Sequence, residues 1–370
     1  MRIPFCDYHI CILLKELFQQ KKPLDLLLNE YFRSHKSIGS HDRKKIADTL
    51  FRLVRYKSLF IYLASSSEPA HVLRCFQKIS LENCCNDPAI PEPHRLGLNE
   101  FLYNQLTSQF GKERTRTLSF ILNSEAPITI RANSAKTTRD SLLTTLSSLG
   151  VFPCKIAPMG IQFKKREPLF SLPEFKAGLF EMQDEGSQLV AELVRVQPGD
   201  HFLDYCSGSG GKALAIAPLM QGKGQVYLHD IRPWILQEAR KRMKRAGLQN
   251  VQFVLPRKKV DWLLADVPCT GTGTLRRNPD AKWKLDRATL ERLVVEQRAI
   301  VKEAVAFLKE GGKFVYATCS LLKEENEEQV EYFLKTFPLQ LEEKPLSLLP
   351  EYGRHDGFFA AVFKKQTLVS

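Results

Sequence analysis

The sequence predicts an α/β protein whose second half forms a doubly wound sheet. From about residue 181 onward, short apolar runs typical of strands alternate with segments of helical periodicity. This alternation indicates a parallel sheet with helices on both faces. Residues 1–120 show helical periodicity, and residues 121–180 mix helical and strand patterns. We therefore expect three parts: an all-helical domain over 1–120, a small α/β module over 121–180, and the sheet domain over 181–370.

The charge of the chain indicates the kind of partner it binds. The 370 residues are enough for two or three domains, and their formal net charge is +13. Such an excess favours a polyanionic partner, with nucleic acid as the first candidate. No run approaches the roughly 20 apolar residues of a membrane-spanning helix, and the amino end lacks a secretory h-region. We expect a cytoplasmic monomer that does not bind a membrane.

The cysteines indicate reduced thiols. There are nine of them, an odd number without the spacing of a disulfide framework. Cys84 and Cys85 are adjacent, and no Cys-x-x-Cys pair occurs. We therefore expect no structural zinc site and no other metal.

The helical region carries a basic helix face. After Ser40 and Asp42, apolar residues recur at helical spacing up to Val54, while the other face carries Arg43, Lys44, Lys45, Arg52 and Arg55. Such a face is most often solvated surface, but in so basic a chain it is also a candidate for phosphate contacts. Turn residues predict a loop over Asn83–Pro93, and helices resume at Arg95.

The remaining elements follow from local patterns. In the small module, Ile128–Asn133 alternates like a strand, Thr138–Leu149 is helical, and short strands are expected around Val151–Phe163. A helix opens at Gln183–Gln188. The predicted strands of the large sheet are His201–Asp204, Gln225–Leu228, Val251–Leu255, Val260–Ala265, Lys313–Ala317 and Phe358–Phe363. The predicted helices between and after them are 212–220, 232–247, 286–309 and 324–336.

A glycine-rich loop follows the first strand of the sheet. It reads Ser207-Gly208-Ser209-Gly210-Gly211-Lys212, and such a loop lets the backbone approach a ligand closely. A P-loop is excluded, because Cys206 and Ala213 occupy positions that need Gly and Ser or Thr. A dinucleotide fingerprint fits loosely. The third candidate is S-adenosylmethionine, with Asp204 on its amino-acid part and Asp230 on its ribose. Since Asp230 suits an NAD ribose equally well, these two elements leave the cofactor open.

Two thiols and a carboxylate follow later strands. Asp266 and Cys269 come directly after Val260–Ala265, and Cys319 follows Lys313–Ala317. Ligands of doubly wound sheets bind outside the carboxyl ends of the strands. A single buried Cys is often a plain core residue, but hydride transfer has no use for two thiols and an Asp. Methylation of a pyrimidine at carbon 5 requires a thiolate that adds to carbon 6, an acid near N3 and a base for the carbon 5 proton. This set therefore favours S-adenosylmethionine and pyrimidine methylation.

These motifs resemble those of the RNA cytosine-5 methyltransferases of the Sun/Fmu family. The resemblance runs from about residue 123 to the end and implies a class I, Rossmann-like methyltransferase domain. The matching stretches are Gln183–Ser187, Asp204–Lys212, Asp266–Gly273, Arg276–Asp280, Thr318–Ser320 and Asp356–Phe359. The first 120 residues resemble, more weakly, the NusB-like domain that precedes the catalytic part in bacterial enzymes that methylate small-subunit ribosomal RNA.

The resemblance also implies roles for site residues. Cys319 would be the nucleophile and Cys269 the thiol that assists product release, an assignment that spacing alone does not give. Asp266 would contact the cytosine ring and Lys212 would lie at the edge of the active site. The implied cofactor-binding residues are Asp204, Cys206, Ser207, Gly208, Ser209, Gly210, Gly211, Lys212, Asp230, Arg232, Asp266 and Pro268.

The chain departs from the family pattern at two places. Ser209 stands where the family usually has Pro. The family also carries an acid near the adenine after the third strand, whereas Val254–Lys259 contains none. We therefore expect weaker binding of S-adenosylmethionine than in relatives that carry the acid.

A second basic stretch runs from Arg232 to Lys259, with nine basic residues and one acid, Glu238. It is either a solvated helix face or a surface for the RNA backbone. The expected function is methylation of cytosine in RNA, with ribosomal RNA as the first substrate. Transfer RNA is the alternative substrate. A catalytically silent RNA-binding or ribosome-assembly protein of the same fold is the alternative function.

Overall fold

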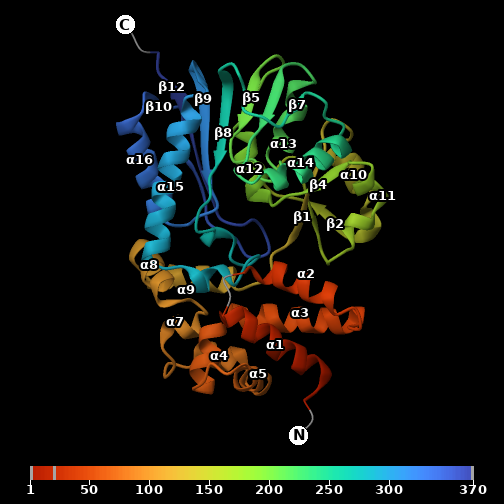
Figure 1. Cartoon of the computed structure of the whole chain (residues 1–370), viewed down its shortest axis with the longest axis vertical. Coiled ribbons are helices and arrows are strands. Elements are labelled where there is room, and N and C mark those ends of the chain that lie inside the picture. Colours follow the sequence, from red (N-terminus) through yellow and green to blue (C-terminus); the bar gives the residue numbers. More distant parts are fainter. Residues whose placement is uncertain (1–2, 20–21, 368–370) are drawn as a thin grey trace. The chain divides into compact units, whose positions relative to one another are not determined.

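The structure is a computed structural model that describes residues 3–19 and 22–367 (Figure 1). The chain divides into two compact units. The first comprises the residues up to Glu125 together with Thr274–Thr289, and the second comprises Ala126–Gly273 and the residues from Leu290 onward. Each unit is described separately below.

The first unit is helical, as predicted. Ile46, Leu50 and Leu53 recur on one face of α3 and are buried without exposed surface, in a core shared with α1, α2 and α5. The α-helices are α1 (Phe5–Gln19), α2 (Leu24–Ser34), α3 (Ser40–Arg55), α4 (Lys57–Ala64), α5 (Pro69–Lys78), α6 (Leu81–Asn86), α7 (Glu92–Arg95), α8 (Glu100–Phe110) and α9 (Lys112–Leu122).

The predicted loop over Asn83–Pro93 is wrong at both of its ends. Helix α6 continues to Asn86, and α7 begins at Glu92 with Pro93 in its first turn. Proline is well tolerated there, because its fixed φ suits a helix and its missing N–H would have no helical partner. Pro93 therefore belongs to the start of a helix here and does not mark a loop.

The segment Thr274–Thr289 packs within the helical unit, although it lies inside the sheet domain expected over 181–370. Lys282 is completely buried, and its Nζ donates to the carbonyl oxygen of Arg55 at 2.8 Å and to Oδ1 of Asn123 at 2.5 Å. Arg55 in turn donates to the carbonyl oxygen of Arg276 at 3.0 Å. These contacts join residues more than 150 positions apart into one polar core.

The second unit contains the predicted sheet, with strand order β10-β12-β9-β8-β5-β6-β7. The strands β9, β8, β5, β6 and β7 are parallel neighbours, as predicted. The strands are β5 (His201–Asp204), β6 (Gln225–Leu228), β7 (Val251–Gln252), β8 (Val260–Asp266), β9 (Leu308–Thr318), β10 (Leu339–Leu341), β11 (Leu346–Leu348) and β12 (Phe358–Lys365).

The sheet is nevertheless mixed, because β12 is antiparallel to β9, and β10 and β11 are antiparallel to β12. A parallel pair needs a long crossover connection, usually with a helix. Residues 349–357, which lead from β11 into β12, contain no helix. This short connection fits the antiparallel pairing of β12 with β11. The antiparallel pairing of β12 with β9 was not revealed by the β–α alternation.

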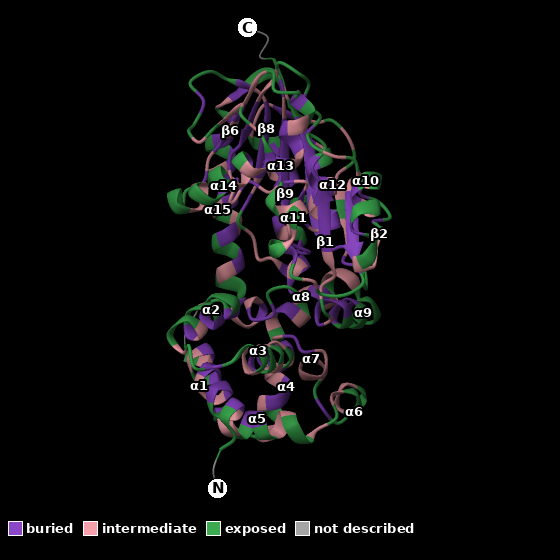
Figure 2. Cartoon of the chain, turned by 90° about the vertical axis from the view of Figure 1, so that its right-hand side faces the viewer, coloured by how far each residue is buried: buried purple, intermediate pink, exposed green. Residues whose placement is uncertain are grey.

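Helices cover both faces of the sheet, as predicted. Phe202 of β5 packs with α12 (Glu185–Glu192), α13 (Ala213–Ile216) and α14 (Pro233–Ala246), whereas its neighbour Leu203 packs with α15 (Arg287–Val305) and α16 (Glu327–Thr336). Successive residues of a strand point to opposite faces, so both are fully buried. Figure 2 shows the central strands coloured as buried along most of their length.

Several predicted boundaries differ from the structure, among them the end of the helix expected over 212–220, where α13 ends at Ile216. The helix expected over 286–309 ends at Val305, and β9 begins at Leu308. The pairing of β9 with β8 is irregular between Val260 and Trp262, and this irregularity has no local sequence pattern. At the sheet edge, β7 contains Val251 and Gln252 alone, because it has β6 as its one paired neighbour.

The small module forms a four-stranded antiparallel sheet of order β2-β3-β1-β4 within the second unit. The first three strands were predicted, whereas β4 was missed. The elements are β1 (Ile128–Ala132), α10 (Arg139–Thr145), β2 (Val151–Pro153), β3 (Gly160–Phe163), α11 (Pro173–Lys176) and β4 (Phe180–Met182). Across both units, none of the described helices has the length and apolar character that crossing a membrane would require.

Candidate active site

Four strand ends bring the predicted site residues to one edge of the sheet. Strand β5 ends at Asp204, β8 ends at Asp266, and β9 is followed directly by Cys319. Because these strands are parallel neighbours, their carboxyl ends meet at the same edge. The end of β6 adds Asp230 and Arg232. The structure thus brings together residues that are up to 115 positions apart in the sequence.

The two thiols form a close pair. The Sγ atoms of Cys269 and Cys319 lie 3.4 Å apart, at hydrogen-bond distance for sulfur, and both residues are partly buried. All nine cysteines lie in the described ranges and are free thiols. The hydrogen bond with Cys319, together with burial, raises the pKa of the Cys269 thiol well above its ordinary value. Cys269 therefore holds its proton while Cys319 is its partner.

Lys212 and Asp266 form an ion pair at the same edge. The Nζ of Lys212 donates to Oδ2 of Asp266 at 2.5 Å. The lysine side chain is 8% exposed and the aspartate side chain is 34% exposed, so Asp266 keeps a face toward solvent. Burial alone would lower the pKa of Lys212, but Asp266, Asp204 and Cys319 together raise it. Lys212 is therefore a cation beside both Asp266 and Cys319.

Asp230 organises the glycine loop. Its Oδ2 accepts from the backbone N of Gly208 at 2.9 Å, and its Oδ1 accepts from the backbone N and Nε of Arg232, each at 2.9 Å. Burial alone would raise the pKa of Asp230, but these hydrogen bonds outweigh it and lower the pKa. Gly210 has φ +79°, and a Cβ there would lie 2.8 Å from the Met243 side chain, so the position favours glycine.

Asp204 offers an unused acceptor beneath this loop. The residue is 1% exposed, and its Oδ1 finds no hydrogen-bond donor among the described residues. Burial, reinforced by the nearby Asp266, raises its pKa to about 8. A buried carboxyl oxygen without a partner fits the cationic amino group of S-adenosylmethionine. Within the described ranges, no cluster of three or more His, Cys, Asp or Glu side chains could hold a metal.

The remaining predicted residues line the same edge. Cys206 is partly buried, and burial together with Asp204 raises its pKa. Ser207 donates from its backbone N to the His229 carbonyl oxygen at 2.9 Å. A Cβ at Gly211 would meet no atom within 4 Å, so this position is open. Pro268 is exposed, and its carbonyl oxygen accepts from Nε2 of Gln297 at 3.0 Å.

Glu325 was not predicted, although it joins the two thiol-bearing loops. It is completely buried and accepts from the backbone N of Thr270 at 2.9 Å, from the Thr270 hydroxyl at 2.5 Å and from Gln297 at 2.9 Å. Thr270 also hydrogen-bonds Ser320 at 3.1 Å. Burial raises the pKa of Glu325 despite these hydrogen bonds. In the sequence, Glu324 and Glu325 look only like an acidic first turn of a helix.

The basic surfaces are smaller than the sequence suggested. On α3, Lys44, Lys45 and Arg52 are exposed, but Arg55 is buried and is not part of a basic surface. In the stretch 232–259, Arg242 and Arg245 bind the buried Glu181 and do not form a solvated face. Lys241 and Lys244 of α14 are exposed, as are Arg257, Lys258 and Lys259.

The segment after β7 is apolar where the family carries an acid. Val254 is 57% exposed and Leu255 is 37% exposed. After the neighbouring strand β6, Ile231 is 88% exposed and Trp234 is 68% exposed. Because β6 and β7 are parallel neighbours, both segments follow the same sheet edge. This edge offers apolar contacts but no carboxylate after β7.

Comparisons with known proteins identify the family of the chain. Residues 191–364 match a family model for the 16S rRNA methyltransferases RsmB/F, and residues 98–169 match one for the ferredoxin-like domain of RsmF/B-like methyltransferases. A Synechocystis sp. protein named "Probable ribosomal RNA small subunit methyltransferase B" is 31% identical over 325 residues, which cover 80% of this chain and 73% of that protein. The ribosomal RNA small subunit methyltransferase B of Escherichia coli O6:K15:H31 is 34% identical over 265 residues, 66% of this chain.

Solved structures show the same fold. The structure of NSun6 from Pyrococcus horikoshii with SFG has a TM-score of 0.64 at 22% identity, covering 73% of this chain and 98% of that one. A methyltransferase homolog protein from the same organism also has a TM-score of 0.64, at 26% identity, covering 75% of this chain and 99% of that one. The chain spans 61% of the length of the E. coli relative. With its two matched domains and its Synechocystis relative, the chain belongs to the RsmB/F family of ribosomal RNA small subunit methyltransferases.

Proposed function

We propose that this protein methylates carbon 5 of a cytosine in RNA, with S-adenosylmethionine as methyl donor and small-subunit ribosomal RNA as substrate. The observation that carries the proposal is the pair of thiols 3.4 Å apart beside the Lys212–Asp266 ion pair. The names of the curated relatives support the RNA substrate. The neighbour crystallised with SFG, an analogue of S-adenosylmethionine, supports the cofactor.

The residues of the first two strand ends suit this cofactor. Asp204 has a buried carboxyl oxygen available for an amino group, and the glycine loop of residues 207–211 allows close approach of the ligand. Asp230, held in place by Gly208 and Arg232, suits the ribose hydroxyls. When bound, S-adenosylmethionine supplies an electrophilic methyl group on its sulfonium sulfur.

Covalent attack activates the cytosine. Carbon 5 is a poor nucleophile until a thiolate adds to carbon 6. We assign this thiolate to Cys319, because Lys212 is a cation beside it and its Sγ lies within hydrogen-bond distance of the Cys269 thiol. As the new C–S bond forms, negative charge develops on the ring, and Asp266 contacts the ring at N3. Lys212 holds Asp266 in position and stabilises this charge.

Product release follows from the same pair of thiols. After methyl transfer, a base must take the remaining proton from carbon 5, and the electron pair of that C–H bond then expels the Cys319 sulfur as a thiolate. Once Cys319 is bound to carbon 6, the hydrogen bond with its thiolate and the negative charge of that thiolate no longer raise the pKa of Cys269. Cys269 then loses its own proton to solvent more readily, and the resulting thiolate takes the proton from carbon 5.

Mapping of 5-methylcytosine in RNA from cells with and without the gene tests this proposal. The expected result is a cytosine of small-subunit ribosomal RNA that loses methylation without the gene and regains it when the gene is restored. Loss of methylation at a cytosine of transfer RNA would instead identify transfer RNA as the substrate. Unchanged methylation in every RNA would favour a silent RNA-binding protein, the alternative to which the acid-free segment after β7 points.

A further inference from the structure

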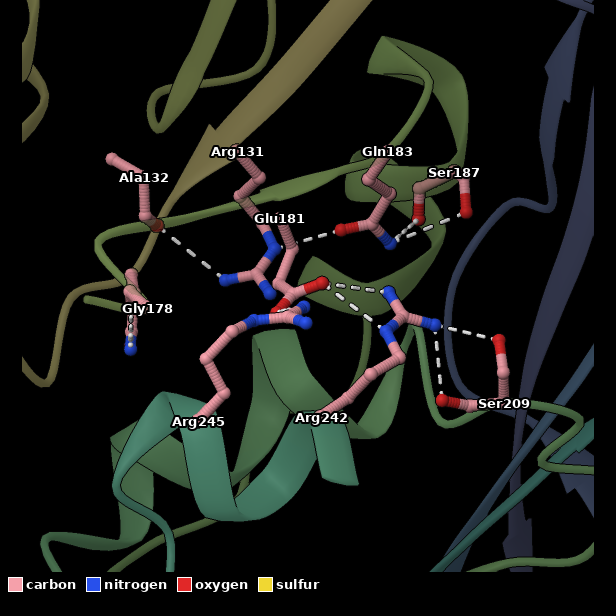
Figure 3. A network of polar contacts seen from close by, with 10 residues as sticks. Arg131, Ala132, Gly178, Glu181, Gln183, Ser187, Ser209, Arg242 and Arg245 are labelled. Carbon is pink, nitrogen blue, oxygen red and sulfur yellow. Dashed lines mark hydrogen bonds and ion pairs between the residues drawn. The ribbon is translucent and has the colours of Figure 1, made fainter. Parts of the chain in front are cut away.

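The glycine loop is restrained by Arg242 of α14, a residue that has no part in the proposed reaction. Nη1 of Arg242 donates to the carbonyl oxygen of Ser209 at 3.0 Å and to its Oγ at 2.6 Å (Figure 3). Ser209 lies between Gly208 and Gly210, which have φ +51° and +79°. Glycine gives a loop conformational freedom, and serine, unlike proline, does not fix φ. The two hydrogen bonds therefore supply a restraint at a position where the family usually has a proline ring.

The same guanidinium is anchored by a buried carboxylate. Nε and Nη2 of Arg242 donate to Oε2 of Glu181 at 3.1 and 3.0 Å, and Arg245 binds the other oxygen of Glu181. The Glu181 side chain is 4% exposed, and its direct cross-strand neighbour in the small module is Arg131. Charge-assisted hydrogen bonds from two nitrogens of one guanidinium group to a buried carboxylate oxygen restrain the position of that group. Arg242 thus connects β4 of the small module to the glycine loop.

The small module also holds the carboxyl end of α14. Lys136 donates from Nζ to the carbonyl oxygen of Arg245 at 2.7 Å, and Asn133 donates from Nδ2 to that of Ala246 at 3.0 Å. These donors satisfy carbonyl groups that have no partner within the helix. A Cβ at Gly178 would lie 2.0 Å from the Arg245 carbonyl oxygen, so the module and the helix end are in close contact.

The amino end of α14 lies at the cofactor site. The helix starts at Pro233, directly after Arg232 and three residues after Asp230. Asp230 accepts a hydrogen bond from the backbone N of Gly208, and Arg242 donates one to the backbone carbonyl oxygen of Ser209. Two neighbouring loop residues are therefore held by the two ends of the segment 230–242. A shift of α14 would therefore move both restraints on the loop together.

We propose that Arg242 is a positioning residue for the cofactor loop and that the small module, through Glu181, fixes where Arg242 lies. The inference rests on the proposed use of S-adenosylmethionine. It adds a role for the small module, which holds the cofactor loop in its binding conformation. Arg242 acts through Ser209, so its loss changes cofactor affinity while the reacting groups stay in place.

Cofactor titration calorimetry with variants of the full-length protein tests this role. Arg242→Met should weaken binding of S-adenosylmethionine about tenfold, and Ser209→Ala, which loses one of the two hydrogen bonds, about threefold. The double variant should bind nearly as weakly as Arg242→Met alone, because both changes remove the same contact. Arg195→Met is the matched control, since Arg195 is exposed and its Nη2 donates to both carboxylate oxygens of Glu343.

Two further measurements separate positioning from general destabilisation. In Arg242→Met the KM for the cofactor should rise while kcat at saturating cofactor stays the same. Hydrogen exchange should speed up in the peptide spanning residues 204–213 and not in β12. If Arg242→Met does not fold, Ser209→Ala and Arg242→Lys carry the test, since both keep the charge that pairs with Glu181.

The outcomes distinguish this inference from the proposed function. If the wild-type protein binds no S-adenosylmethionine, the proposed function is wrong. Wild-type protein that binds cofactor, together with Arg242→Met and Ser209→Ala variants of unchanged affinity and unchanged loop exchange, would overturn the positioning role alone.

Discussion

The cofactor loop and the thiol loops lie at the same sheet edge but are held in opposite ways. Residues 207–212 are restrained by charged groups from outside, Asp230 at Gly208 and Arg242 at Ser209. The loops of Cys269 and Cys319 are joined from within by a buried network around Glu325. Buried polar networks rigidify a site when every member is satisfied. The difference indicates a rigid centre for the proposed covalent chemistry beside a loop whose conformation depends on contacts with the small module.

The strongest test of the thiol loops separates the two cysteines. Cys319→Ala should abolish methylation and form no covalent RNA adduct, because no sulfur remains to attack carbon 6. Cys269→Ala should still attack and then stall, leaving protein cross-linked to RNA on denaturing gels. Cys84→Ala, in α6 of the helical unit, is the matched control and should behave as wild type. The reverse pattern, with a stalled adduct in Cys319→Ala, would exchange the two roles.

Removal of Glu325 tests whether the thiol loops are held from within. Glu325→Ala should destabilise the protein by about 2–4 kcal/mol, because the donors on Thr270 and Gln297 lose a buried acceptor. Glu325→Gln keeps one acceptor oxygen and should cost less. Glu328→Gln, which alters an exposed pair with Lys323, is the control and should stay within about 0.5 kcal/mol. Equal denaturation midpoints for all three variants would show that the network does not restrain these loops.

The cofactor side is tested by affinity. A relative that carries the acid after the third strand should bind S-adenosylmethionine more tightly by roughly tenfold to a hundredfold. The reason is that one charge-assisted hydrogen bond contributes about 1.5–3 kcal/mol. Calorimetry on both proteins under the same conditions measures the difference. Equal affinities would show that the apolar residues after β6 and β7 compensate for the missing acid.

Asp204 makes cofactor binding depend on pH. Its pKa of about 8 means that the carboxyl group is mostly protonated at pH 7, whereas the cationic amino group of the cofactor favours the ionised form. Binding should therefore release a proton below pH 8, and affinity should rise about tenfold per pH unit up to that value. Calorimetry in two buffers of different ionisation enthalpy counts the protons. Asp204→Asn should release none, and a pH-independent wild type would contradict this assignment.

The smallest expected effects concern RNA binding. The exposed pairs Lys44 and Lys45 on α3, and Lys241 and Lys244 on α14, are candidates for phosphate contacts. Each contact adds roughly 0.7–0.9 to the slope of log affinity against log salt. Replacing either pair by Met should flatten that slope, whereas replacing the exposed Lys302 and Lys335 should not. Unchanged slopes would make both pairs ordinary solvent-exposed surface.

The sequence predicted the strand ends at the sheet edge better than it predicted the side-chain contacts that hold the loops there. Strands β5 and β6 have the predicted bounds, because buried apolar runs bounded by turn residues carry a strong local signal. The positions of Asp204, Asp266 and Cys319 follow from strand ends alone. The contacts of Glu181 and Glu325 were missed because they join residues far apart in the sequence, and no local pattern indicates them. For the same reason, the sequence did not indicate that residues 274–289 pack in the helical unit.

That last segment has a consequence for how the protein is made. The helical unit ends its first stretch at Glu125, but its core also needs Lys282, whose buried amine binds Arg55 and Asn123. A ribosome adding about 5–20 residues per second needs on the order of 10 s or more to synthesise the chain between them. During synthesis, the partners of Lys282 in the first 125 residues are therefore made well before the lysine that binds them, and this part of the core is completed only after the second half of the polypeptide has emerged.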